Sequence, residues 1–241
     1  MNREQFLDKE FSNMPDRNQN GRNNMPEASL RRLPTYYRLL QQLLSRGDRQ
    51  VSCADLARSL NLDPTQVRKD IEMTGIVGKP RVGYPLAELM GWLENFLGWN
   101  RPKSAVLAGA GQLGGALLGY QKFRDHGMQI VGVFDVDAEK IGQRIHGCEV
   151  QPLMFLPDFV RRTQTLIGVI ATPAAAAQSV AEIMVCGGIR AIWNFAPAHI
   201  LVPDFIILQN EDLYNSLASL SVRLERRLGA KPLENSYDEN H

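Results

Sequence analysis

The stretch Ala105-Val106-Leu107-Ala108-Gly109-Ala110-Gly111-Gln112-Leu113-Gly114 decides the fold of the second half of this chain. Its apolar residues predict a short buried strand, which runs straight into a G-x-G-x-x-G turn that opens a helix. Gly109 permits the tight turn, Gly111 lets a pyrophosphate approach the backbone, and Gly114 lets helix and strand pack closely. The amide groups at the start of the helix would hold the pyrophosphate of a dinucleotide.

The residues that follow alternate between helical and strand patterns. A helix is predicted from Ala116 to about Arg124 and a strand at 130–134, which completes a βαβ unit. Further strands are predicted at 166–171, 191–195 and 205–209, with helices at about 155–163 and 174–187. This alternation predicts an α/β domain of the Rossmann type, with a doubly wound, mostly parallel sheet.

Asp135 ends the second strand, 21 residues after Gly114, close to the spacing at which an acid reads the ribose of a dinucleotide. Its carboxylate suits ribose hydroxyls and repels a 2′-phosphate, so the sequence favours NAD over NADP. Two further strand ends are candidates to line a nicotinamide pocket, although each also fits ordinary turn chemistry. The candidate NAD(H)-binding residues are Gly109, Ala110, Gly111, Gln112, Leu113, Gly114, Asp135, Val136, Thr172, Pro173, Asn194, Phe195 and Ala196.

The first half of the chain carries a local positive charge. Residues 31–81 hold ten Lys and Arg side chains against five Asp and Glu, whereas the whole chain has a net charge of +1. Helices are predicted from Leu30 to Gly47, from Ser52, from Asp63 and from Leu86 to about Leu97, with a hairpin at 79–84. This order predicts a winged helix-turn-helix whose third helix enters the major groove of double-stranded DNA. A helical dimerisation module with charged surface helices is the alternative.

Composition and the chain ends limit the remaining possibilities. The three cysteines are too few and too scattered for a disulfide framework or a zinc site, no apolar run is long enough to span a membrane, and the charged start is unlike a signal peptide. A cytoplasmic protein is therefore expected. The predicted organisation is a disordered arm at 1–26, a DNA-binding domain at 27–99, a Rossmann domain at 100–210, a C-terminal helix at 211–230 and a flexible tail at 231–241.

Taken together, several motifs resemble the Rex family of redox-sensing transcriptional repressors over residues 26–226. They include 32–38 and 65–70 in the first half, and 109–114, 134–137, 172–178 and 194–197 in the second. The resemblance implies a homodimer that binds a palindromic operator, is released when NADH binds, and swaps its C-terminal helix between subunits. The DNA-binding candidates are Arg32, Tyr36, Thr65, Gln66, Arg68, Lys69, Lys79 and Arg81.

The resemblance also implies a conformational latch, and it shows that the wing of this chain differs from the family pattern. In the family an acid at the start of the swapped helix pairs with an arginine of the DNA-binding domain or with a tyrosine near the first Rossmann helix. The matching residues here are Asp212, next to Leu213, with Arg38 and Tyr120. The wing departs from the family pattern: it reads Lys79-Pro80-Arg81-Val82-Gly83, where Pro80 fixes φ and removes an N–H.

Two other functions fit a Rossmann domain with an accessory domain. A dehydrogenase needs a general base, and none of the four histidines, nor any Ser/Tyr/Lys set, has a convincing position for hydride transfer. A CoA-binding module shares the glycine turn, but CoA offers no free ribose diol to Asp135. The sequence therefore predicts a regulator without catalytic or metal-binding residues.

Overall fold

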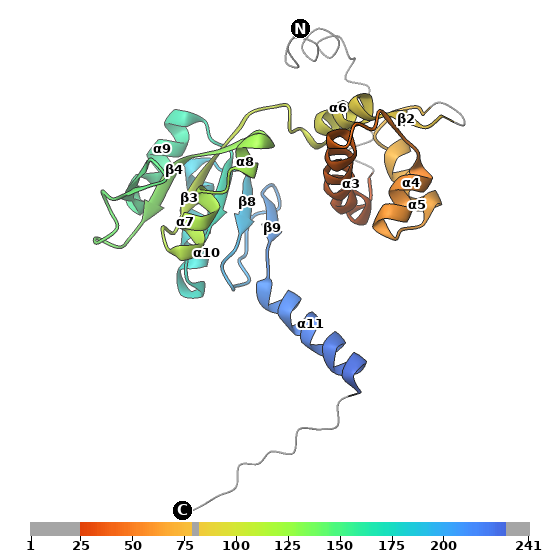
Figure 1. Ribbon diagram of the computed structural model, residues 1–241. Coiled ribbons are helices and arrows are strands. Elements are labelled where there is room, and N and C mark those ends of the chain that lie inside the picture. Colours follow the sequence, from red (N-terminus) through yellow and green to blue (C-terminus); the bar gives the residue numbers. More distant parts are fainter. Residues whose placement is uncertain (1–24, 79–81, 230–241) are drawn as a thin grey trace, which may run out of the picture. The chain divides into compact units, whose positions relative to one another are not determined.

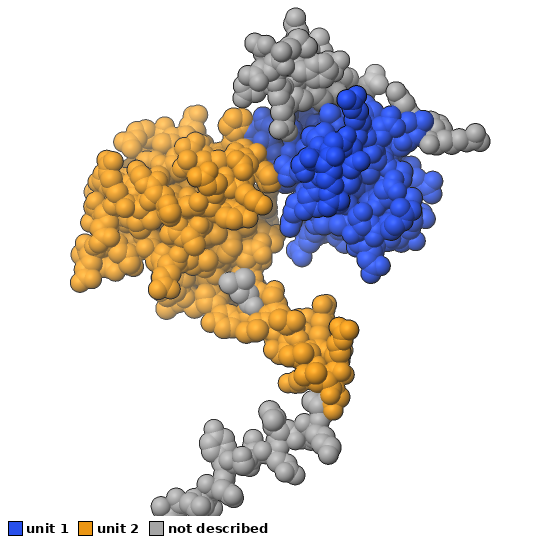
Figure 2. Space-filling view, viewed as in Figure 1, with its two compact units in different colours: residues 1–101 blue, residues 102–241 orange. Residues whose placement is uncertain are grey.

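The computed structural model describes residues 25–78 and 82–229, which fall into two compact units divided between Arg101 and Pro102 (Figure 2). The expected tail at 231–241 and nearly all of the expected arm at 1–26 lie outside the described residues. Lys79 and Arg81, the candidate DNA contacts of the wing, also lie outside them.

The first unit is a small helical domain with a two-stranded sheet (Figure 1). Strands β1 and β2 pair antiparallel, with Val51 opposite Tyr84. Fully buried leucines from three helices, Leu33, Leu56 and Leu89, contribute to one core. The elements in chain order are α3 (Glu27–Ser45), β1 (Gln50–Val51), α4 (Cys53–Leu60), α5 (Pro64–Glu72), β2 (Tyr84–Pro85) and α6 (Leu86–Leu97).

Short-range signals set the ends of the helix-turn-helix. Ser52 and Asp55 form a complete capping box at the start of α4. Asn61 ends that helix in the left-handed conformation, and Asp63 caps α5 through the Gln66 amide, with Pro64 as the first helical residue. These features set a short turn between α4 and α5, and the helix-turn-helix predicted from the sequence is confirmed.

The second unit is built on a seven-stranded sheet in the order β5-β6-β4-β3-β7-β8-β9. All neighbouring strands pair parallel except β5, which pairs antiparallel with β6. The strands are β3 (Lys103–Ala108), β4 (Met128–Asp135), β5 (Arg144–Ile145), β6 (Cys148–Pro152), β7 (Ile167–Ile170), β8 (Ala191–Asn194) and β9 (Ile207–Asn210). The predicted parallel sheet is therefore confirmed.

Helices cover both faces of this sheet (Figure 1). One face packs against α9 and α10 through residues such as Val160 and Met184, and the other packs against α7 through Leu118. The helices are α7 (Gln112–Leu118), α8 (Lys122–Asp125), α9 (Leu156–Thr163), α10 (Ala174–Gly187) and α11 (Leu213–Leu228), with a 3-10 turn at Leu153–Phe155. The fold is a doubly wound Rossmann domain followed by a terminal helix.

Two features of this unit differ from the sequence prediction. The single helix expected from Ala116 to about Arg124 is broken after Leu118, and α8 begins at Lys122. A side chain at Gly119 would meet the ring of His146 at 2.5 Å, so the β5–β6 hairpin packs directly on the break. Strand β6 itself was not predicted, because its sequence, Cys-Glu-Val-Gln-Pro, lacks the apolar run of a buried parallel strand.

Candidate functional site

The carboxyl ends of four neighbouring strands bring the candidate dinucleotide residues to one edge of the sheet. Ala108 at the end of β3 lies beside Phe134 of β4 and Ile170 of β7, and Ile170 lies beside Asn194 of β8. The residues after these strands therefore lie at neighbouring positions along the edge. In open α/β sheets this edge is where ligands bind.

The glycine turn has a different steric constraint at each glycine. Gly109 has a φ of +102°, and a Cβ there would lie 2.5 Å from the Ala171 carbonyl oxygen. A Cβ on Gly114 would lie 1.8 Å from the Gly109 carbonyl oxygen, so helix and loop touch. A Cβ on Gly111 would meet nothing within 4 Å. The turn therefore leaves open space at Gly111, as a backbone cradle for a pyrophosphate requires.

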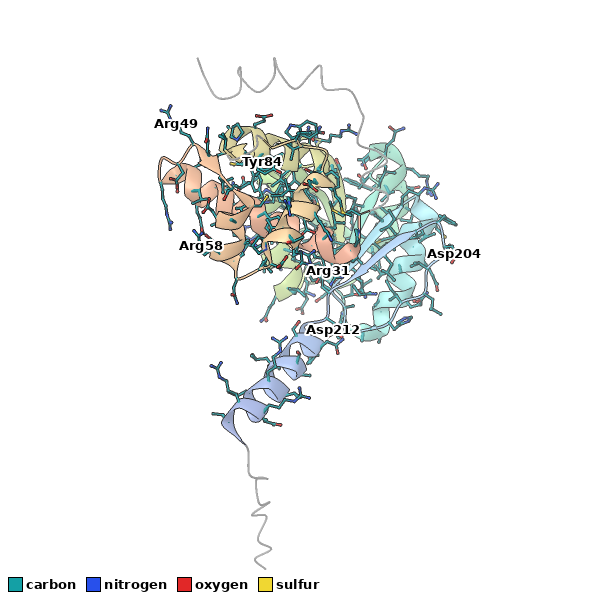
Figure 3. All side chains as sticks on the ribbon, turned by 90° about the vertical axis from the view of Figure 1, so that its right-hand side faces the viewer. Arg31, Arg49, Arg58, Tyr84, Asp204 and Asp212 are labelled. Carbon is teal, nitrogen blue, oxygen red and sulfur yellow. The ribbon has the colours of Figure 1, made fainter. Side chains whose placement is uncertain are left out.

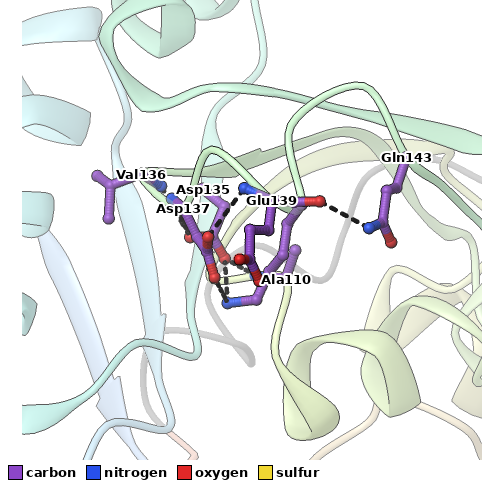
Figure 4. A network of polar contacts seen from close by, with 7 residues as sticks. Ala110, Asp135, Val136, Asp137, Glu139 and Gln143 are labelled. Atoms are coloured by element: carbon purple, nitrogen blue, oxygen red, sulfur yellow. Dashed lines mark hydrogen bonds and ion pairs between the residues drawn. The ribbon is translucent and has the colours of Figure 1, made fainter.

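Asp135 is nearly buried and is held by backbone amides. Its carboxylate accepts hydrogen bonds from the amides of Ala110 at 2.7 Å, Val136 at 2.8 Å and Asp137 at 2.9 Å (Figure 4). Burial alone would raise the pKa of Asp135, but the amides of Asp137 and Ala110 and the nearby Lys140 ammonium hold that pKa below its ordinary value. The side chain is a fixed anion that also ties the glycine turn to the end of β4.

Thr172 supplies an unused polar group at the end of β7. Its hydroxyl oxygen is buried and finds no hydrogen-bond partner among the described residues. Buried polar atoms are rarely left unpaired, and such an atom near the carboxyl ends of the strands fits a ligand group. The glycine cradle, the Asp135 anion and this hydroxyl together fit a dinucleotide.

Asn194 differs from the role that the sequence suggested. Its side chain is 1% exposed, donates to Asn210 Oδ1 at 2.9 Å and to the Ala198 carbonyl at 3.1 Å, and accepts from the Ala196 amide at 3.0 Å. These bonds occupy the amide group, so Asn194 shapes the 195–198 turn instead of offering a free group to a ligand. Phe195, the next residue, is partly exposed, and Pro173, which follows β7, is exposed.

A row of aromatic rings, which sequence reasoning missed, runs from α8 to the end of β8. Ring centroids are 4.9 Å apart for Tyr120 and Phe123, 5.3 Å for Phe123 and Trp193, and 4.7 Å for Trp193 and Phe195. The Trp193 indole donates to Glu211 Oε1 at 3.0 Å. The row therefore links the broken first helix to the residue before Asp212, a link between segments that no local pattern could reveal.

Helix α5 presents four of the predicted DNA-binding side chains to solvent. Thr65, Gln66, Arg68 and Lys69 are all exposed, while Val67 and Ile71 face the core. Arg and Gln side chains can make bidentate contacts with guanine and adenine in the major groove. The exposed face of α5 thus has the chemistry of a recognition helix.

Arg32 and Tyr36 lie on α3, and both bind Asp70 of α5. Tyr36 is fully buried, and its hydroxyl donates to Asp70 Oδ2 at 2.6 Å. Arg32 grips the same carboxylate with Nε at 2.7 Å and Nη2 at 2.9 Å. With the Gln66 amide oriented so that its oxygen faces Arg32, that oxygen accepts from Nη1 at 3.2 Å and Nη2 at 3.0 Å. Both residues thus help to fix the position of α5; Tyr36 is buried away from the surface, whereas Arg32 is still partly exposed beside Gln66.

Two of the candidate latch residues are exposed on their own units, and a third caps a helix. Arg38 is exposed on α3, and Tyr120 is half exposed at the break between α7 and α8. Asp212 lies at the start of α11 (Figure 3) and is its N-cap, and its side chain accepts from the Asn215 amide at 3.0 Å. Leu213 begins that helix, and its side chain lies outside the description.

Other kinds of site receive no support from the part of the chain that the structure describes. Within residues 25–78 and 82–229, no group of three or more His, Cys, Asp or Glu side chains could hold a metal ion. Among those same residues, no helix combines the length and the apolar character that crossing a membrane requires.

The fold and the site define a two-domain protein in which a winged helix-turn-helix precedes a Rossmann domain with a dinucleotide-type glycine turn. Two family models match these parts: "Putative DNA-binding protein N-terminus" at residues 24–71 and "CoA binding domain" at residues 100–198. The second model describes the alternative ligand class that the glycine turn left open.

Comparison with known proteins identifies the family. The chain is 43% identical over 199 residues to a redox-sensing transcriptional repressor Rex of Treponema denticola, covering 83% of this chain and 95% of that protein. It is 40% identical over 203 residues to the protein of the same name of Bacteroides thetaiotaomicron, with 83% and 91% covered. The chain belongs to the Rex family of redox-sensing transcriptional repressors, as its motifs predicted.

Solved structures agree with this identification. RSP, a Rex-family repressor, in complex with β-NAD⁺ and operator DNA matches with a TM-score of 0.82 and 34% identity, covering 89% of this chain and 99% of that one. RSP in complex with β-NADH matches with a TM-score of 0.77 and 33% identity, covering 85% and 96%. Both matches span the two units, so the whole described architecture is that of a Rex-family repressor.

Proposed function

We propose that this protein is a DNA-binding transcriptional repressor that senses the NADH/NAD⁺ ratio and leaves its operator when NADH binds. The observation that carries the proposal is the carboxyl edge of the sheet, where an open glycine cradle, a fixed carboxylate and an unpaired threonine hydroxyl meet. The names of the curated relatives, and the dinucleotides and operator DNA in the RSP structures, support it.

Different residues of the chain would bind the different parts of the dinucleotide. The turn from Gly109 to Gly114 would hold the pyrophosphate, and Asp135 would accept a ribose hydroxyl beside the exposed Val136. Thr172 would donate to or accept from the nicotinamide carboxamide, and Pro173, Phe195 and Ala196 would form the surface around that ring. When bound, the cofactor supplies a ring whose two redox states differ by a hydride.

The DNA-binding unit would read a palindromic operator in double-stranded DNA through α5. Arg68 and Gln66 would contact base edges, with Thr65 and Lys69 beside them. Lys79 and Arg81 are proposed as wing contacts to phosphates or the minor groove. Arg32 and Tyr36 would act indirectly, because their bonds to Asp70 fix the position of α5.

The protein would act as a regulator, not as an enzyme, and in the cytoplasm, where a bacterial repressor meets its operator. The match to the CoA-binding-domain model favours CoA as the second candidate ligand. Asp135 favours NAD(H), because its buried charge suits a neutral ribose diol and opposes a phosphorylated ribose. Tryptophan quenching by NADH but not by CoA would separate the two ligands.

The assembly would be a homodimer in which α11 packs on the partner subunit. All described side chains of α11 are exposed, including Leu217, Leu220 and Leu224 on one stripe. A stripe of this kind normally faces another helix or a core. In the proposed switch, Asp212 pairs with Arg38 in the DNA-bound form and with Tyr120 when NADH is bound. The aromatic row from Tyr120 to Trp193, with the bond from Trp193 to Glu211, connects the start of α11 to the end of β8.

The experiment measures operator affinity with and without saturating NADH, on an operator isolated from a genomic fragment library. Typical allosteric coupling predicts a loss of roughly 5–150-fold on adding NADH. Gly111→Ala is the matched variant: its φ of −78° suits alanine and its Cβ meets no neighbour, so folding and DNA binding should persist while the response to NADH is lost. A wild type whose operator affinity ignores NADH would contradict the proposal.

A further inference from the structure

The carboxylate proposed to read the ribose has no free acceptor position. Asp135 Oδ1 accepts from the Val136 and Asp137 amides, and Oδ2 accepts from the Ala110 amide (Figure 4). The fourth position is filled by Lys140, whose Nζ lies 3.4 Å from Oδ2. A carboxylate offers about four lone-pair sites. A ribose hydroxyl can therefore bind Asp135 only where Lys140 now binds.

Lys140 can also form an ion pair with a second carboxylate, that of Asp137. Its Nζ lies 3.1 Å from Asp137 Oδ2, closer than to Asp135. Asp137 is 40% exposed at its side chain, whereas that of Asp135 is 9% exposed. The other oxygen of Asp137 accepts from the Glu139 amide at 3.0 Å, which holds this carboxylate in place (Figure 4). Lys140 can thus leave Asp135 without losing its ion pair.

We propose that Lys140 is the displaceable fourth partner of Asp135 and, together with Asp137, sets how strongly the protein prefers NADH to NADPH. The inference rests on the proposed function, in that this edge must hold a dinucleotide. When a ribose hydroxyl takes the place of Lys140 at Asp135, the ammonium stays beside Asp137. The 2′-phosphate of NADPH then meets two carboxylates and one ammonium, and is repelled less than by two carboxylates alone.

Two substitutions test the role of Lys140, and only the one at Asp137 should weaken NADH binding. Lys140→Met removes the competitor and the cation, so NADH should bind equally or up to about threefold more tightly, and NADPH about tenfold more weakly. Asp137→Asn keeps Oδ1 for the Glu139 amide but replaces the oxygen that receives Lys140. Lys140 then stays on Asp135, and NADH should bind about three- to tenfold more weakly.

A double-substitution cycle shows whether Asp137 acts through Lys140. The Lys140→Met, Asp137→Asn double variant should bind NADH like Lys140→Met alone, because the competitor that Asp137 controls is gone. NADH and NADPH are titrated into wild type and all three variants by calorimetry. Lys103→Met is the control for loss of a positive charge, because Lys103 begins β3 at the opposite edge of the sheet. It should leave both affinities unchanged.

The outcomes distinguish a failure of this inference from a failure of the proposed NADH-sensing function. If the wild type binds neither dinucleotide, the proposed function fails. If the wild type binds NADH but Lys140→Met leaves the NADH-to-NADPH ratio within twofold of wild type, only the role of Lys140 is overturned. If Asp137→Asn weakens NADH equally with and without Lys140, Asp137 acts by another route and the displacement model is wrong.

Discussion

At the scale of single residues, Asp70 joins α5 to α3 in the DNA-binding unit. Its side chain is 3% exposed and receives Arg32 and Tyr36, both from α3. Burial alone would raise the pKa of Asp70, but hydrogen bonds from Arg32, Tyr36 and Ser29 outweigh it and lower that pKa. Burial and the bond to Asp70 raise the pKa of the Tyr36 hydroxyl, which therefore stays protonated. The bonds form a pH-dependent anchor for α5.

Asp70→Asn should lower the free energy of unfolding of the first unit by roughly 3 kcal/mol at pH 7, because it leaves a partly buried guanidinium without its carboxylate. A carboxyl group with a lowered folded pKa stabilises above its unfolded pKa of about 3.9, and this contribution is lost as pH falls through the folded value. The gap between wild type and variant should therefore stay constant from pH 7 to about pH 5 and shrink below about pH 4.

Urea unfolding followed by tryptophan fluorescence can measure this gap. Both proteins carry Trp193→Phe, so the signal comes from Trp92 and Trp99 of the first unit. Asp48→Asn is the matched control: Asp48 is an exposed acid of the same unit that lies outside the helices, so its loss should change the free energy of unfolding little. A gap between wild type and Asp70→Asn that persists unchanged to pH 3 would argue against the anchor.

At the scale of elements, α11 differs from the other long helices of its unit. Helices α9 and α10 bury residues on the sheet, whereas each described side chain of α11 is exposed. Asp212 caps its start and Gly229, in the left-handed conformation, ends it. Local signals are thus sufficient to form the helix, while no other described part of the chain packs against its leucine stripe.

Leu217→Asp with Leu220→Asp should convert a dimer to a monomer at micromolar concentration, since each change puts a charge into the proposed apolar interface. Sedimentation velocity of wild type and variant would show the change. Ser219→Asp adds one charge on the same helix away from the stripe and should leave the dimer intact. A wild type that sediments as a monomer, or a double variant that remains a dimer, would refute the assignment of α11 to the interface.

At the scale of the whole molecule, the proposed switch must convert a difference of one hydride into a change in DNA affinity. A ligand shifts a two-state equilibrium only by its different affinity for the two states. The aromatic row joins Tyr120 to Trp193, and Trp193 binds Glu211 beside Asp212. In the proposed switch, this chain of contacts would carry the change at the nicotinamide ring to the start of α11.

Asp212→Asn should keep NADH affinity within a few-fold of wild type but reduce the effect of NADH on operator binding to less than about threefold, against roughly 5–150-fold for wild type. Asparagine caps a helix as well as aspartate, so the start of α11 is kept while the charge is lost. Operator affinities of both proteins at saturating NADH provide the measurement. Asp204→Asn, an exposed acid outside α11, should respond like wild type. A full response by Asp212→Asn would remove this residue from the switch.

The family, the fold and the starts of α4 and α5 could be predicted because their signals are local. The capping groups Ser52 and Asp63 act within three residues, and the glycine turn with Asp135 is a spacing along one βαβ unit. The short, apolar strands of the sheet were recognisable for the same reason. In each case the deciding interaction lies close in sequence or follows a regular period.

Tertiary structure decided the points that depend on residues far apart in the chain. Arg32 and Asp70 are 38 residues apart, and only their contact shows that Arg32 anchors α5. The position of Asn194 among Ala196, Ala198 and Asn210 turned a candidate ligand contact into a structural group. Polar side chains read the same in sequence whether they face water, ligand or protein; burial and the available partners decide which, and both are properties of the folded chain.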